Sequence, residues 1–89
     1  MEPDDMLAAL LELARSLGIE VRKTLSGPSE RGGALVRLKG KEILILDASA
    51  GQADQIVAAA SALRGRPQLE ERFLPPEIRA AIESAATDG

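Results

Sequence analysis

Residues 34–47, ALVRLKGKEILILD, decide the fold of this chain, because they predict a β-hairpin whose second strand is apolar on both faces. The first strand leads into Lys39-Gly40, a dipeptide suited to a two-residue turn. Ile43 to Leu46 then form an unbroken apolar run that ends at Asp47. A strand of this kind needs a cover on each face, so the rest of the domain has to be arranged around it.

The residues before the hairpin predict one helix and one strand. The helix begins in the acidic segment 2–5 and ends near Leu17, where Gly18 suits the left-handed conformation of a helix C-terminus. Alternation of apolar and polar side chains over 19–25 predicts a strand. The turn-forming residues 26–33, SGPSERGG, predict a loop before the hairpin.

Two further helices are predicted after the hairpin. Ser49 and Gln52 have the spacing of a capping box and open a second helix, which stops at Arg64-Gly65. Pro75-Pro76 opens the third helix. The segment between these helices is expected to be held against the domain by three apolar anchors, Leu69, Phe73 and Leu74.

The order helix, strand, strand, strand, helix, helix predicts a single α+β domain over residues 1–89, with frayed ends at 1–3 and 86–89. Because short connections favour antiparallel neighbours, we expect a three-stranded antiparallel meander with the helices packed on it. The pattern leaves open whether the Ile43/Ile45 or the Leu44/Leu46 pair points away from the helices. It also leaves open whether the C-terminal segment or a second subunit covers that face.

Composition excludes most catalytic chemistry. The chain contains neither Cys nor His, so thiolate nucleophiles, disulfides and the commonest metal ligands are absent. Gly27 and Gly33 do not form a phosphate loop, because Ala34 follows where such a loop needs Lys. Asp47 and Ser49 are interpreted as turn and cap residues. We therefore expect no catalytic residue, no metal site and no cofactor.

The sequence predicts a cytoplasmic protein without a membrane segment. Its N-terminal residues are acidic, whereas a secretory signal begins with basic residues. The apolar runs are far shorter than the roughly 18 to 20 residues that a membrane span requires.

The signs of charge are segregated along the chain. Segment 15–41 carries seven basic and two acidic residues, which gives +5 within a chain of net charge −3. Such a segment could bind an anion or the phosphate backbone of a nucleic acid. The candidate basic patch consists of Arg22, Lys23, Arg31, Lys39 and Lys41. The acidic net charge and the single aromatic residue, Phe73, make nucleic-acid binding the alternative rather than the leading interpretation.

The leading interpretation is a small non-enzymatic intracellular domain that associates with itself as a homodimer or docks another protein. A doubly apolar strand in a chain with a small core leaves one face for a partner. The candidate interaction face consists of Leu35, Arg37, Leu44, Leu46 and Phe73.

The run GGALVRLKGKEILILD, followed by a capped helix and by FLPPEIRAAIE, resembles a group of short bacterial proteins of no established activity. They share a Gly-Gly, hairpin and LPP-x-[IV]-R layout, and the similarity covers about residues 7–83. A looser resemblance is to small zinc-metallopeptidase domains, in which a helix bearing H-E-x-x-H follows the hairpin. The corresponding helix here reads QIVAAASAL at 55–63, so this resemblance implies a related shell without the metal site.

Overall fold

The computed structural model describes residues 2–25 and 32–86. The chain forms, in order, α1 (Pro3–Ser16), β1 (Glu20–Thr24), β2 (Gly33–Leu38), β3 (Lys41–Asp47), α2 (Gln52–Leu63), η1 (Pro67–Glu71) and α3 (Pro76–Ala86). The α+β class and the predicted order of helices and strands are confirmed. The 3-10 helix η1 is an addition between α2 and α3.

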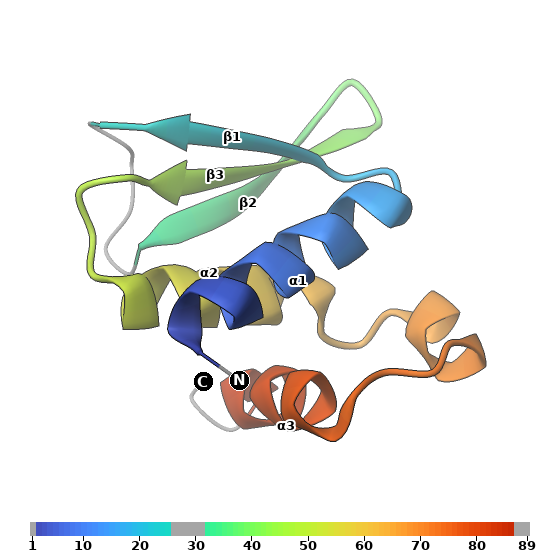
Figure 1. Cartoon of the computed structure of the whole chain (residues 1–89). Helices are drawn as coiled ribbons and strands as arrows, with labels where there is room; N and C mark the ends of the chain where they lie inside the picture. Colours follow the sequence, from blue (N-terminus) through green and yellow to red (C-terminus); the bar gives the residue numbers. More distant parts are fainter. Residues whose placement is uncertain (1, 26–31, 87–89) are drawn as a thin grey trace.

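The elements form three layers (Figure 1). The sheet is the first layer, α1 and α2 lie beneath it, and α3 lies on the far side of these two helices. Within the described part of the chain, α3 contacts α1 and α2 but no strand. The C-terminal segment therefore does not reach the sheet, and one sheet face is left without a covering element among the described residues.

The sheet is mixed, and the predicted antiparallel meander is wrong. Its strand order is β1-β3-β2, with β3 parallel to β1 and antiparallel to β2. In a meander β2 would be central and β3 would be an edge strand. The observed order instead places the most apolar strand in the middle, where both of its edges and most of its side chains are protected. β1 and β2, which are consecutive along the chain, therefore lie at opposite edges of the sheet.

Strand register shows which side chains share a face. Leu44 pairs with Val21 and Leu35, and it points toward the helices together with Leu46. Both leucines are fully buried. Ile43 and Ile45 therefore lie on the opposite face, which answers the question that the apolar run left open.

The first helix folds as its sequence predicts. Its buried stripe consists of Leu7, Leu10, Leu11 and Ala14. The helix stops at Gly18, whose φ of 89° is in the left-handed region. The Ile19 N–H then donates to the Ala14 carbonyl at 3.0 Å, so the open end of the helix is satisfied by the backbone.

The start of α2 differs from the prediction. The helix begins at Gln52 without a side-chain cap, and Ser49 donates its backbone N–H and its hydroxyl to the Asp47 carboxylate. This local turn at the end of β3 engages Ser49, so the predicted capping box does not form. The interpretation of Asp47 as a turn residue is confirmed.

The segment between α2 and α3 has two apolar anchors rather than three. Leu69 and Leu74 are buried in the core, as predicted. Phe73 is 88% exposed, so its predicted role as an anchor is wrong. Successive side chains of the extended stretch after η1 point in different directions, so Leu74 points into the core and Phe73 points to solvent.

None of the described helices combines the length and the apolar character needed to cross a membrane.

Candidate interaction surface

The uncovered side of the sheet, called here the open face, is apolar over β2 and β3. By register, Ala34, Val36 and Leu38 of β2 share this face with Ile43 and Ile45 of β3. Val36 is 37% exposed and Leu38 is 59% exposed. Ile43 is only 8% exposed, because its strand is flanked on both sides. The result is an apolar strip that runs toward the free edge of β2.

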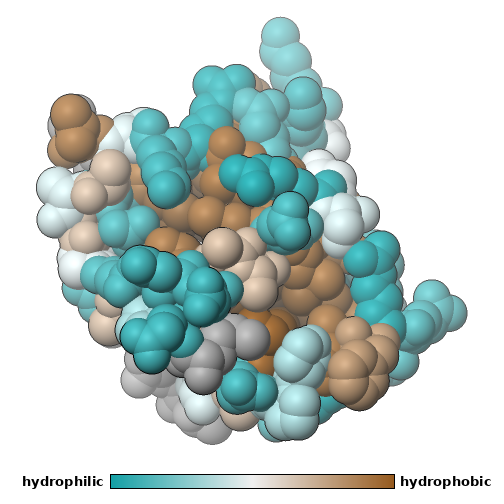
Figure 2. Space-filling view, viewed as in Figure 1, coloured by the Kyte–Doolittle hydropathy of each residue, from teal (hydrophilic) through white to brown (hydrophobic). Residues whose placement is uncertain are grey.

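The other part of the open face, over β1, carries charged side chains of both signs that contact one another. The Glu20 carboxylate accepts a hydrogen bond from the Arg22 guanidinium and lies 3.2 Å from the Lys41 ammonium. These two hydrogen-bonding partners lower the pKa of Glu20, although burial opposes them. In Figure 2 hydrophilic side chains dominate the upper rim of the molecule. Charge therefore borders the apolar strip on its β1 side.

At the free edge of β2, backbone groups point away from the sheet, and no described strand pairs with them. The Asp47 N–H donates to the Gly32 carbonyl at 2.8 Å, so alternate residues from Gly32 onward direct their backbone toward β3. Gly33, Leu35 and Arg37 consequently direct their N–H and C=O groups away from the sheet. The large apolar side chains with high exposure are Leu25, Leu35, Val36, Leu38 and Phe73. Three of these five belong to β2, which concentrates exposed apolar surface at one edge.

The structure does not bring the predicted interaction face together. Leu44 and Leu46 are 0% exposed and belong to the core, so neither is accessible to a partner of the folded chain. Leu35 and Arg37 point to the helix side, at the rim of β2. Phe73 lies outside the sheet, between η1 and α3. Within the strands, side chains alternate between the two faces of the sheet, so a residue and its neighbour in sequence point to opposite faces.

Val36 and Leu38 were not assigned to this face from the sequence, and Ile43 and Ile45 were one of the two alternatives that the apolar run left open. Their apolar character was visible, but the two faces of β3 are equally apolar. The signal that separates them is tertiary: Gly33 lies close to Ala58 of α2 and so assigns the odd-numbered residues of β2 to the helix side.

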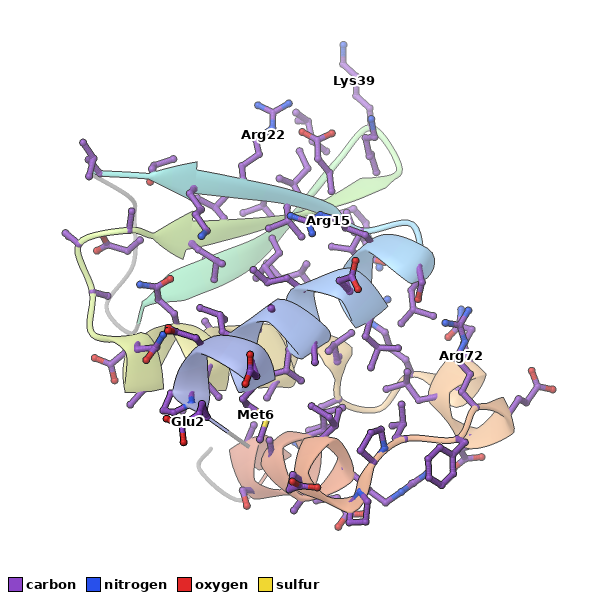
Figure 3. The ribbon with its side chains drawn as sticks, in the orientation of Figure 1. Glu2, Met6, Arg15, Arg22, Lys39 and Arg72 are labelled. Atoms are coloured by element: carbon purple, nitrogen blue, oxygen red, sulfur yellow. The ribbon has the colours of Figure 1, made fainter. Side chains whose placement is uncertain are left out.

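The predicted basic patch is dispersed. Arg22 and Lys41 share the open face and both contact Glu20, whereas Lys23 points to the helix side. Lys39 is in the hairpin turn with a φ of 51°. Figure 3 shows Arg22 and Lys39 projecting away from the helices. Arg31 lies outside the described residues.

A bidentate ion pair joins the end of α2 to the central strand. Two guanidinium nitrogens of Arg66 donate to the Glu42 carboxylate at 2.8 and 2.7 Å, and Arg66 Nε donates to the Ala62 carbonyl. The pair is partly buried, with 17% and 21% of the two side chains exposed. The hydrogen bonds from Arg66 are the main reason that the pKa of Glu42 is lowered to about 2; burial opposes them and Arg37 assists. This contact holds the hairpin, and with it β2, against the helix layer.

Stability is expected to fall in acid as Glu42 becomes protonated. Because the folded-state pKa of Glu42 is depressed from 4.5 to about 2, its contribution is fully present above about pH 5 and is lost as the pH falls toward 2. Glu42→Gln should flatten this part of the curve of unfolding free energy against pH, measured by urea melts. Glu71→Gln, which removes an exposed carboxylate from η1, is the matched control. An unchanged acid profile in Glu42→Gln would contradict the assignment.

Other hollows in the described surface are lined by apolar and charged side chains. One of about 260 Å³ lies between η1 and α3, with Leu69, Leu74 and Ile82 among its lining residues. A second lies along α1 and is bordered by both acidic and basic side chains. Across residues 2–25 and 32–86, no cluster of three or more acidic side chains could hold a metal ion. These hollows offer shape but no recognisable reactive centre.

Comparison of the chain with protein-family models, with curated proteins and with solved structures found no match. Function therefore has to be inferred from the chemistry of the chain's own surface.

Proposed function

We propose that this protein is a non-enzymatic interaction domain that associates, with itself or with another protein, through the apolar strip of the open face and the adjoining edge of β2. The observation that carries the proposal is the position of the helices, which all lie on one side of the sheet. On the other side, Val36 and Leu38 of the apolar strip remain exposed to solvent. Burial of apolar surface contributes roughly 25 cal/mol per Å², so covering this strip would favour association.

The distribution of polar groups supports binding to a protein rather than to a polyanion. Arg22 and Lys41 are both engaged by the Glu20 carboxylate, and Lys23 lies on the opposite face. A polyanion site needs several uncompensated cations along one surface. An apolar strip with a charged border instead matches the usual composition of a protein interface, which has an apolar centre and a polar rim.

The proposal of a non-enzymatic role follows from side-chain chemistry. The chain has no His and no Cys, which leaves carboxylates, hydroxyls, Lys and Arg for any reaction. Two of its carboxylates with lowered pKa, Glu20 and Glu42, are engaged by cations, which suits structural ion pairs. A general acid or base would need a pKa moved toward neutrality instead.

Site-specific photo-crosslinking tests this function. A photoreactive residue at Leu38, on the open face, is expected to give discrete adducts in cells of the source organism. The same residue at Ala80, an exposed position on α3 far from the sheet, is the matched control and should give none. An adduct of twice the chain mass indicates self-association, and any other mass indicates a different protein. Equal labelling at both positions, or none at either, would refute the proposed function.

A further inference from the structure

We propose that the partner is a second copy of this chain, joined by antiparallel pairing of the two β2 edges about a two-fold axis at Leu35. This inference rests on the proposed function and names the partner. It would convert two three-stranded sheets into one continuous sheet with the order β1-β3-β2-β2-β3-β1. Because the axis is perpendicular to the sheet, the helices of both copies would lie on the same side.

The first reason is that the sequence of β2 has few of the features that normally prevent pairing at an edge. Exposed edge strands are usually protected by prolines, by several charges, by bulges or by a covering segment. β2, with the sequence GALVRL, has no proline and a single charge. β1, the other edge, has three charged residues in five. The outward backbone groups of Gly33, Leu35 and Arg37 can therefore bond a second strand at β2 more readily than at β1.

The second reason is that exposed apolar side chains would meet across the axis. Leu35, 39% exposed, would face Leu35 of the partner subunit on the helix side. On the open face, Val36 would face Ala34 of the partner subunit. Cross-strand pairs of this kind are the unit of sheet stabilisation. The pairing would thus cover part of the exposed apolar surface of β2, at Leu35 and Val36.

The third reason is charge. With the axis at Leu35, Arg37 lies opposite Gly33 of the partner subunit, and the two arginines are about four residues, or ~13 Å, apart along the strands. An axis shifted by one residue, to Val36, would bring them to about 7 Å on the same face. Like charges so close on one face disfavour that register, so Leu35 is the preferred centre.

Arg37 would also approach an acidic group of the other copy. Its side chain is 73% exposed and forms an ion pair with Glu42 at 3.3 Å. Opposite it, the chain at Gly32 packs against the first turn of α2 at Asp54, since a Cβ on Gly32 would be 2.6 Å from the Asp54 carbonyl. Asp54 is exposed. Each copy thus offers an arginine to the acidic turn of the other.

Solution mass across a dilution series tests the dimer. Light scattering should show dimers that dissociate on dilution, and Leu35→Lys should raise the dissociation constant by about tenfold or more, since it places two charges at the centre of the interface. Leu25→Lys is the matched control: Leu25 is 81% exposed and lies outside β2, so this variant should dimerise like the parent chain. A parent chain that stays monomeric to millimolar concentration would overturn the inference.

Charge exchange tests the contact between Arg37 and Asp54. Arg37→Glu and Asp54→Arg should each weaken the dimer, and the double variant should restore it. A purely structural role in the monomer predicts no restoration. If the two single variants and the double variant dimerise with equal affinity, Arg37 and Asp54 do not contact each other across the interface.

Cysteine crosslinking tests the register and does not depend on the folding of Leu35→Lys. The chain has no cysteine, so a single introduced thiol is unique. Across the axis two Leu35→Cys residues would have Cα atoms about 5.5 Å apart, within the range for a disulfide, and should oxidise to a covalent dimer. Leu38→Cys should not. Crosslinking at Leu38 alone would mean that the open faces stack, which overturns the edge pairing but keeps the proposed function. A photo-adduct with a different protein, together with a monomeric chain, would also overturn the edge pairing and keep the proposed function.

Discussion

Gly32→Ala is expected to destabilise the protein by about 3 kcal/mol, a large part of the stability of a domain of this size. Gly32 has a φ of 82°, which costs an L-residue roughly 1–2 kcal/mol. An added Cβ would also lie 2.6 Å from the backbone of Asp54 and 2.8 Å from the Gln55 nitrogen. These atoms belong to a helix and cannot move aside as a flexible side chain would, so overpacking adds a further ~1–3 kcal/mol.

Gly18→Ala is the matched control for this effect. Gly18 has a similar φ, 89°, but no atom lies within 4 Å of the position of its added Cβ. Its cost should be limited to backbone strain of about 1 kcal/mol. The measurement is urea unfolding followed by far-ultraviolet circular dichroism, since the chain has no Trp or Tyr. Equal losses in the two variants would show that β2 can move away from α2 without cost.

Leu44→Ala should be similarly damaging, with a loss of about 3–5 kcal/mol in the free energy of unfolding. Leu44 is fully buried in the central strand, and truncation leaves a cavity between the sheet and the helices. Leu38→Ala is the control, because Leu38 is 59% exposed and should cost the monomer less than about 1 kcal/mol.

This pair of variants also tests the assignment of the two faces. Losses are to be measured by the same urea unfolding, at low protein concentration so that association does not contribute. A larger loss in Leu38→Ala than in Leu44→Ala would mean that the face carrying Leu38, rather than the one carrying Leu44, is the buried one.

The prediction for Gly32 concerns how β2 is held at the edge of the sheet. Gly32 lets the chain pass close to the first turn of α2, and Gly33 has an equally close approach to the Ile45 carbonyl. The sequence interpreted 26–33 as a flexible loop. The structure instead assigns two of its glycines, the last ones, to tight backbone packing, and this packing sets the position of the edge that is proposed to bind a second copy.

Local signals predicted the elements well. The spacing of leucines in α1, the stop at Gly18 and the turn at Lys39-Gly40 each depend on residues within a few positions of one another, and the structure confirms all three. The capping box at Ser49 failed for an equally local reason. The Asp47 carboxylate accepts the hydrogen bond of the Ser49 hydroxyl, and this turn competes with the helix cap for the same hydroxyl.

The candidate site could be predicted only in part. Apolar character and the doubly apolar strand were visible in the sequence, which led to the expectation of a face in need of a cover. The sequence did not show which residues belong to that face, because Leu44 and Ile45 are chemically alike and differ only in the direction in which they point. The basic patch failed for the same reason, since Arg22 and Lys23 are neighbours in sequence and lie on opposite faces.

The sequence by itself determined the order of the three α-helices and the three strands, the absence of His and Cys chemistry, and the presence of a strand that is apolar on both faces. Only the tertiary structure decided that this strand is central, that β1 runs parallel to it, and that α3 packs beneath the helices instead of over the sheet. The physical reason is the range of the interactions. Helix periodicity, caps and turns act over a few residues, whereas strand order and the choice of buried face depend on the total apolar surface removed from water when distant segments meet.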